Sequence, residues 1–216
     1  MKNQNQPLTL FDIPVIILCG GKSSRMGEDK TYLPFGKTDT LIEFQYKRLS
    51  SLFKHVYISS KKNHFDFLTS QQRHCVLLDD TLTAYSPIIA LKSILKQVTT
   101  PNVFIITVDT PFISEKTIKT LINKADNYEI TIACSTEKDY HLCGVFSSSL
   151  LLRIEDMLNN DIHKIGYLIK KSHTQIIQFE HEKEFLNMNT KSDYLEALTI
   201  LKKSPNSSEN IYKLSL

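Results

Sequence analysis

The chain has 216 residues, of which 41% are hydrophobic and 23% charged, and its formal net charge at pH 7 is +3. This length suits one domain with a sizeable core, and the hydrophobic share is typical of a globular protein and excludes a fully disordered chain. The small net charge argues against a nucleic-acid-binding or membrane-surface protein. The four cysteines, at 19, 75, 134 and 143, form no C-x-x-C pair, so we expect reduced, free thiols.

Targeting signals are not expected. No apolar run approaches the ~18 residues that span a bilayer. The run 15–19 superficially resembles a lipoprotein export signal, but Asp12 interrupts the segment, only Lys2 precedes it, and bulky Leu18 stands where a cleavage site needs small residues. We therefore predict a cytoplasmic protein whose partners include neither membranes nor nucleic acids.

The chain is expected to divide into three segments. Residues 1–12 form a polar leader, 13–202 the folded domain, and 203–216 a polar tail that we expect to be mostly disordered.

Within the domain, apolar runs of strand length alternate with amphipathic patterns. Strands are expected at 13–19, 54–60, 74–79, 102–108, 129–135, 141–147 and 174–179. Helices are expected at 40–53, 86–98, 115–125, 147–158, 161–171 and 190–202. The last helix begins with Thr190 and Asp193 at the spacing of a capping box.

This alternation predicts a three-layer α/β/α sandwich with a mostly parallel sheet. The run 103–108 is apolar except for Thr107, as expected of a central strand covered on both faces. Only residues 136–140 separate the strands at 129–135 and 141–147, so we expect these two to pair antiparallel. Binding loops are expected at the carboxyl ends of the parallel strands.

Glycines gather after the first expected strand. The chain has six glycines, and four of them lie between residues 20 and 36. Glycines at a strand exit allow the backbone amides to approach a ligand, and Lys22, Arg25 and Lys30 add positive charge, so a triphosphate is the natural ligand. The alternative from glycine clustering alone is a surface turn. The spacing fits neither a Walker A loop nor the G-x-G-x-x-G fingerprint.

The order of residues in this segment, L-x-G-G-x-S-x-R-M-G-x-D-K-x-x-L, resembles the signature of the molybdenum cofactor guanylyltransferases. These enzymes belong to the sugar-nucleotide-type nucleotidyltransferases, whose fold is a Rossmann-like α/β/α sandwich. The fixed positions of the signature are met by Leu18, Gly20, Gly21, Ser23, Arg25, Met26, Gly27, Asp29, Lys30 and Leu33.

The resemblance implies transfer of GMP from GTP to the phosphate of molybdenum-molybdopterin, with release of pyrophosphate. It implies contacts to the guanine base and nucleotide from Leu18, Cys19 and Gly20, and contacts to the phosphates from Arg25 and Lys30. Molybdoenzymes or their chaperones are the further partners that it suggests.

Asp109 ends the most apolar strand, in the sequence Asp-Thr-Pro-Phe. A carboxylate at the end of a central strand is suited to Mg²⁺, although a plain helix cap or turn would use the same residues. The family has a D-x-P-F/Y motif here, which implies that Asp109 binds nucleotide and Mg²⁺, with Mn²⁺ as the alternative ion. Arg25, Lys30 and Asp109 are thus the expected catalytic residues.

Further contacts follow from the resemblance. Ser59 stands where the family has a polar residue after the second strand, and Asp80 matches an Asp that ends the third, with Asp79 as the neighbouring alternative. Asn187 and Asn189 match an F-x-N-x-N-T motif expected on the acceptor side, although Asn and Thr before a helix are also ordinary caps.

The chain departs from the family in places. Ser86 and Ala90 stand where relatives tend to have the glycines of G-P-L-x-G, and Lys191 replaces a proline. Three other functions stay open: cytidylyl transfer to the same pterin, nucleotidyl transfer to a sugar phosphate, and non-catalytic carriage of molybdenum cofactor. The adjacent glycines favour the guanylyl branch, and a carrier would not need Asp109, Lys30 and Arg25 together.

Overall fold

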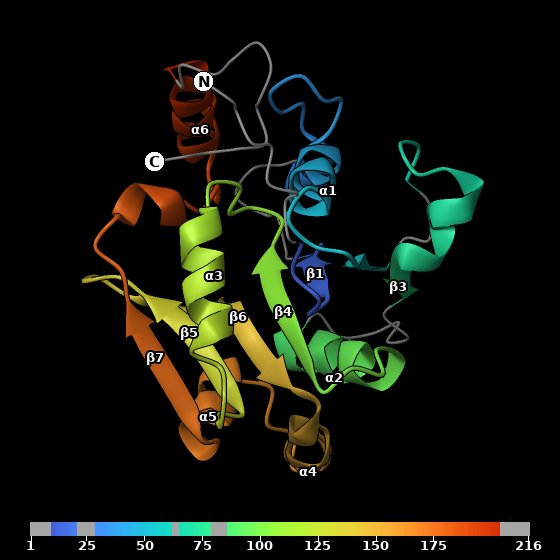
Figure 1. The fold of residues 1–216 in the computed structure, drawn as a ribbon, viewed down its shortest axis with the longest axis vertical. Coiled ribbons are helices and arrows are strands. Elements are labelled where there is room, and N and C mark those ends of the chain that lie inside the picture. The colour runs from blue at the N-terminus through green and yellow to red at the C-terminus, as the bar shows by residue number, and fades with distance from the viewer. Residues whose placement is uncertain (1–9, 21–28, 62–64, 79–85, 204–216) are drawn as a thin grey trace, which may run out of the picture.

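A seven-stranded mixed sheet forms the centre of the molecule, which we describe from a computed structural model over residues 10–20, 29–61, 65–78 and 86–203 (Figure 1). The strand order is β3-β2-β1-β4-β6-β5-β7. The strands are β1 (Val15–Leu18), β2 (Val56–Ser60), β3 (Val76–Leu78), β4 (Asn102–Thr107), β5 (Ile130–Cys134), β6 (Asp139–Ser147) and β7 (Thr174–Gln178). The pairs β1–β2, β1–β4, β2–β3 and β5–β7 are parallel, and β6 runs antiparallel to both of its neighbours.

Helices cover both faces of the sheet, as the predicted three-layer sandwich requires (Figure 1). They are α1 (Leu41–Ser50), α2 (Pro87–Gln97), α3 (Glu115–Asn123), α4 (Leu151–Asn159), α5 (Ile165–Lys171) and α6 (Lys191–Lys203). Successive side chains of a strand point to opposite faces of the sheet. Ile17 therefore packs with α1, α3 and α6 on one face, whereas Ile16 packs with α2, α4 and α5 on the other. This alternation explains why β1 is apolar at every position and β4 is apolar from Val103 to Ile106.

The predicted elements are confirmed in type and order, with boundaries that differ by a few residues. The antiparallel pairing of the strands at 129–135 and 141–147 is confirmed. The capping box is confirmed too, because Thr190 N donates to Asp193 Oδ2 at 2.8 Å and Asp193 N donates to Thr190 Oγ1 at 3.2 Å. The expected boundaries of leader, domain and tail stay predictions, since residues 1–9 and 204–216 lie outside the described ranges.

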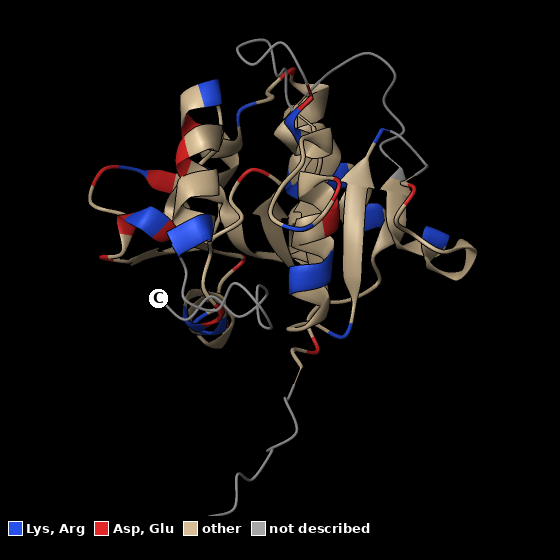
Figure 2. Ribbon diagram, turned by 90° about the horizontal axis from the view of Figure 1, so that it is seen from above, with Lys and Arg blue, Asp and Glu red and all other residues tan. Residues whose placement is uncertain are grey.

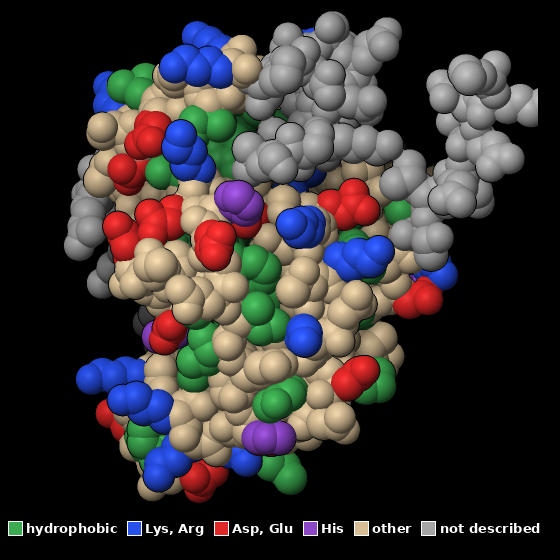
Figure 3. Space-filling model, turned by 60° about the vertical axis from the view of Figure 1, so that its left-hand side comes forward, with side chains coloured by type: hydrophobic (Ala, Val, Ile, Leu, Met, Phe, Trp, Pro, Cys, Tyr) green, Lys and Arg blue, Asp and Glu red, His purple; other side chains and the backbone are tan. Residues whose placement is uncertain are grey.

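Charged side chains of both signs are mixed on the surface. Figure 2 shows blue and red residues scattered over the helices and loops, and Figure 3 shows the same mixture on one face of the molecule. In the described part of the chain, no helix is long and apolar enough to cross a membrane. The cytoplasmic location stays a prediction.

The insertion of β6 between β4 and β5 requires a glycine at residue 144. The register between β5 and β6 shifts between Ile132 and Ala133, which marks a β-bulge. Beside the bulge the two backbones approach so closely that a Cβ on Gly144 would lie 2.0 Å from the carbonyl oxygen of Thr131. No side chain fits there without displacing a central strand.

We expect Gly144→Ala to lower the free energy of unfolding by about 3 kcal/mol, because a methyl group would collide with the backbone of β5. Gly166→Ala is the matched control: among the described residues its Cβ would meet only His141 Cε1, at 3.6 Å, and alanine favours the helix by up to ~1 kcal/mol. Urea unfolding of both variants checks this prediction, and equal stability of the two would contradict it.

Candidate functional site

The candidate site lies at the carboxyl ends of β1 and β4, the two parallel strands at the centre of the sheet. The next strand in the chain after β1 is β2, which lies on one side of β1, whereas β4 lies on the other side, so the strand order reverses between β1 and β4. Such a switch point creates a crevice in which open α/β sheets bind their ligands. Val108 N donates to Leu18 O at 3.1 Å, which holds the two strand exits together.

Asp109 lies two residues after the end of β4 and is 7% exposed. One of its carboxylate oxygens, Oδ2, accepts from Lys30 Nζ in an ion pair. The other, Oδ1, is buried and has no hydrogen-bond partner among the described residues. A buried carboxylate oxygen without a donor is costly, and this one keeps free capacity for a donor or a cation.

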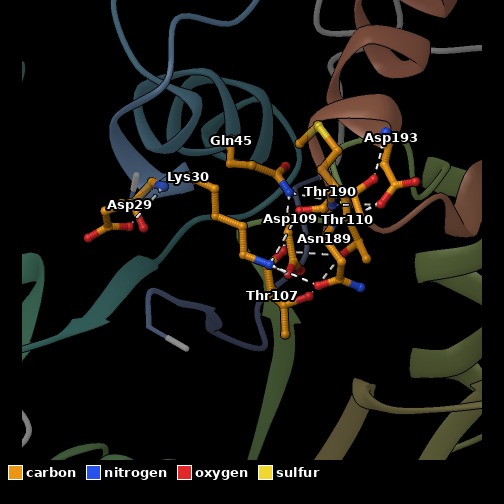
Figure 4. A network of polar contacts seen from close by, with 11 residues as sticks. Asp29, Lys30, Gln45, Thr107, Asp109, Thr110, Asn189, Thr190 and Asp193 are labelled. Carbon is orange, nitrogen blue, oxygen red and sulfur yellow. Dashed lines mark hydrogen bonds and ion pairs between the residues drawn. The ribbon is translucent and has the colours of Figure 1, made fainter. Parts of the chain in front are cut away.

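Lys30 brings three distant segments together (Figure 4). Besides Asp109, its ammonium donates to Asn189 Oδ1 at 3.2 Å and to the carbonyl oxygen of Met188 at 3.4 Å. Met188 N in turn donates to the backbone oxygen of Asp109 at 3.0 Å. Asp29 starts the short 3-10 helix 30–32 by accepting from Thr31 N, which fixes the backbone that carries the lysine.

The residues expected to contact the base and nucleotide lie on the adjacent strand ends. Leu18 ends β1 and pairs in register with Ser59 of β2. Cys19 N donates to Ser59 O at 2.9 Å. Gly20 has φ +142°, which L side chains rarely adopt, so the backbone conformation at this position favours a glycine.

Other expected residues divide into two groups. Asn187 and Asn189 lie in the segment before α6, and the Oδ1 atom of Asn187 is buried without a partner in the described ranges. Arg25, Asp80 and its alternative Asp79 lie outside the described residues. The structure thus brings Lys30, Asp109 and Asn189 into direct contact, with Leu18, Cys19, Gly20 and Ser59 on the neighbouring strands.

Electrostatics favours a neutral thiol beside the site. Burial, with the negative charges of Asp29 and Asp109 as smaller causes, raises the pKa of the Cys19 thiol well above its ordinary value. Cys19 therefore stays protonated at neutral pH and packs against the core. Over the described segments, no group of three or more His, Cys, Asp or Glu side chains is placed to hold a metal ion.

Gln45 and Arg48 of α1 were not anticipated from the sequence, yet both contact the loop that carries Asp109. A signal was available, because both occupy the buried face of an amphipathic helix, where polar side chains are uncommon.

Comparison with known proteins places this geometry in context. The family described as MobA-like NTP transferase domain matches residues 15–176. The chain is 38% identical over 190 residues to a molybdenum cofactor guanylyltransferase from Campylobacter jejuni subsp. doylei, covering 87% of this chain and 96% of that protein. It is 34% identical over 200 residues to the Helicobacter pylori (strain G27) protein of the same name, covering 90% and 96%. In fold it is similar to the crystal structure of molybdopterin-guanine dinucleotide biosynthesis protein A from Archaeoglobus fulgidus, with a TM-score of 0.71, 17% identity, and coverage of 89% of this chain and 100% of that chain.

We expect Asp29→Asn to speed alkylation of Cys19 by iodoacetamide at pH 8. Removing the negative charge lowers the pKa of the thiol and so increases the thiolate fraction, while an amide oxygen can still cap Thr31 N. Mass spectrometry of the alkylated peptides measures the rate, with Cys75 of the same protein as the internal control. An unchanged or slower rate at Cys19 would contradict the assigned electrostatics.

Proposed function

The chain belongs to the MobA-like NTP transferase family, and from this premise we infer that it is a molybdenum cofactor guanylyltransferase. It transfers GMP from GTP to the phosphate of molybdenum-molybdopterin, giving the guanine dinucleotide form of the cofactor and pyrophosphate. The observation that carries the proposal is the meeting of Lys30, Asp109 and Asn189 beside the end of β1. It joins a cation, a carboxylate and an amide in the crevice where this fold binds nucleotides.

The reaction needs positioning and charge more than acid–base chemistry. A phosphate oxygen of the pterin attacks the α-phosphorus of GTP, and the bond from that phosphorus to the bridging oxygen breaks, so pyrophosphate leaves. The attacking oxygen is already anionic, so no strong general base is required. What the protein must supply is alignment of the two phosphates and compensation of the charge on the leaving group.

We propose that Asp109 holds Mg²⁺, with Mn²⁺ as the alternative ion. The fit rests on the Oδ1 atom of Asp109, a hard oxygen donor that is buried and has no hydrogen-bond partner among the residues described. Mg²⁺ commonly takes one or two carboxylates and completes its coordination with substrate phosphates and water. When bound, the ion supplies positive charge next to the phosphates.

Lys30 would then exchange partners. In the structure its ammonium is held by Asp109 and Asn189, so its charge is already in the crevice before substrate arrives. A triphosphate entering beside the end of β1 offers this ammonium new oxygen acceptors, which frees Asp109 Oδ2 as well. By the family motif, Arg25 would contact the same phosphates, and Leu18, Cys19, Gly20, Ser59 and Asp80 the rest of the nucleotide.

Asn187 and Asn189 would face the acceptor. Asn189 lies beside Lys30, and Asn187 carries a buried carbonyl oxygen without a partner in the described part of the chain. Such a group gains most from a ligand donor, because its burial is otherwise uncompensated. Molybdoenzymes or their chaperones, as recipients of the product, stay a prediction.

The test of the function is release of pyrophosphate by the purified protein with Mg²⁺, molybdenum-molybdopterin and one nucleotide at a time. We expect release with GTP, dependent on the pterin, and mass spectrometry should find the guanine dinucleotide as the product. Release with CTP in place of GTP would assign cytidylyl transfer. No release with GTP, CTP, ATP or UTP from folded protein would contradict nucleotidyl transfer to this acceptor.

We expect Asp109→Ala and Lys30→Ala each to lower kcat/KM by about 10²-fold or more, since each substitution removes a charged side chain that would lie beside the reacting phosphates. Steady-state pyrophosphate release measures the loss, and circular dichroism checks the fold. Lys54→Ala is the matched control, because this exposed lysine pairs with Asp12 before β1. Normal turnover by either site variant would contradict the assigned roles.

A further inference from the structure

The loop that carries Asp109 is held by side chains from another part of the chain. It joins the end of β4 at Thr107 to the start of α3 at Glu115. Gln45 of α1 donates from Nε2 to the carbonyl oxygen of Thr110 at 3.1 Å and to that of Thr107 at 3.4 Å (Figure 4). These two carbonyls flank Asp109, so one side-chain amide spans the turn on which the carboxylate sits.

Arg48, one helical turn further along α1, fixes the orientation of that amide. Its Nε donates to Gln45 Oε1 at 3.1 Å, which turns the donor end of the amide toward the loop. Its Nη1 donates to the carbonyl oxygen of Ile113 at 2.7 Å. Gln45 and Arg48 are 0% and 1% exposed. Together they contact the loop at both of its ends.

The peptide group between Ile113 and Ser114 is bound from two sides by opposite charges. Its carbonyl accepts from Arg48, and its N–H donates to Glu184 Oε2 at 2.9 Å. The other carboxylate oxygen, Oε1, accepts from Thr117 Oγ1 at 2.9 Å. Burial lowers the pKa of Arg48 to about 10, so the guanidinium still carries its charge at neutral pH.

Burying the charged side chains of Arg48 and Glu184 carries a large desolvation cost. Replacing such groups by apolar side chains of similar volume is often neutral or stabilising, so stability alone does not account for them. What they provide is direction, because Arg48 binds the main-chain carbonyl of Ile113 and Glu184 binds the main-chain N–H of Ser114, both in the loop that carries Asp109. Even the Asp109 backbone is held, because its carbonyl accepts from Met188 N.

We propose that Gln45 and Arg48 are positioning residues of the transferase site, which fix the loop 107–114 so that the Asp109 carboxylate meets Lys30 and the phosphates. The inference deepens the proposed function and rests on it for its effect on turnover. Gln45 holds the turn that carries Asp109, and Arg48 holds both Gln45 and the far end of the loop. Neither touches the reacting atoms.

This assignment predicts a particular kinetic defect. A loop free to move by about 1 Å misplaces a charge at the reacting phosphates, which costs up to ~10²-fold in rate. Binding of the nucleotide base through the end of β1 does not depend on this loop in the same way. The loss should therefore fall on kcat rather than on KM for GTP.

The test is Gln45→Met, which keeps the length of the side chain and removes both donors. We expect kcat for pyrophosphate release to fall about 10- to 100-fold, with KM for GTP changed less than about threefold. We also expect faster hydrogen–deuterium exchange of the amides in 107–114. Gln45→Glu keeps the shape of the side chain and the oxygen that accepts from Arg48. We expect it to show the same defects as Gln45→Met, and it replaces that variant in the test if Gln45→Met aggregates.

Leu49→Ala is the matched control. It lies on the same helix, is also fully buried, and loses about 2–5 kcal/mol of stability without removing a side-chain hydrogen bond to the loop. We expect it to retain kcat and the exchange pattern of 107–114. A kcat loss as large in Leu49→Ala would show that lost stability explains the defect and would overturn the proposal.

Two results in a folded Gln45 variant would also overturn the proposal: unchanged hydrogen–deuterium exchange in 107–114, or an unchanged kcat. If the wild-type protein released no pyrophosphate, the proposed function would fail by itself. The exchange measurement would still decide whether Gln45 holds the loop.

Discussion

The contact between Lys30 and Asp109 is the interaction on which the site depends. It joins the segment after the glycine-rich stretch to the end of the central strand β4, and the lysine also binds the segment before α6 through Asn189. Because the partners lie 79 residues apart, the pair forms only when the sheet has assembled. The fold thereby places a positive and a negative charge side by side at the carboxyl ends of β1 and β4.

Charge in this region is balanced rather than accumulated. One carboxylate oxygen of Asp109 is in the ion pair with Lys30, and the other has no partner in the described ranges. The site therefore holds both the Lys30 ammonium and an unused hydrogen-bond acceptor. The neighbouring Cys19 thiol is kept neutral by burial and by the same negative charges. Beneath the loop, Arg48 and Glu184 repeat the pattern, with one buried peptide group between opposite charges. Such an environment suits a reaction in which charge moves between phosphates.

Most of the framework could be predicted from the sequence, because its signals are local. Apolar runs marked the strands, the Thr190–Asp193 spacing marked the start of α6, and Asp109 stood visibly at the end of a buried strand. What could not be predicted depends on contacts between distant segments. Nothing local shows that β6 enters between β4 and β5, or that Gly144 meets the β5 backbone there. The hydrogen bond from Gln45 to the carbonyl oxygen of Thr110, 65 residues away, likewise forms only once α1 has packed against the loop.

The most direct test of the site is a crystal structure of the protein with GTP and Mn²⁺ in the absence of the pterin. Anomalous scattering locates the metal independently of the nucleotide. The account predicts a manganese peak on the Asp109 carboxylate, the triphosphate beside the ends of β1 and β4, and Lys30 Nζ on phosphate oxygen. A nucleotide bound elsewhere, or a metal away from Asp109 with the Lys30 ion pair intact, would contradict it.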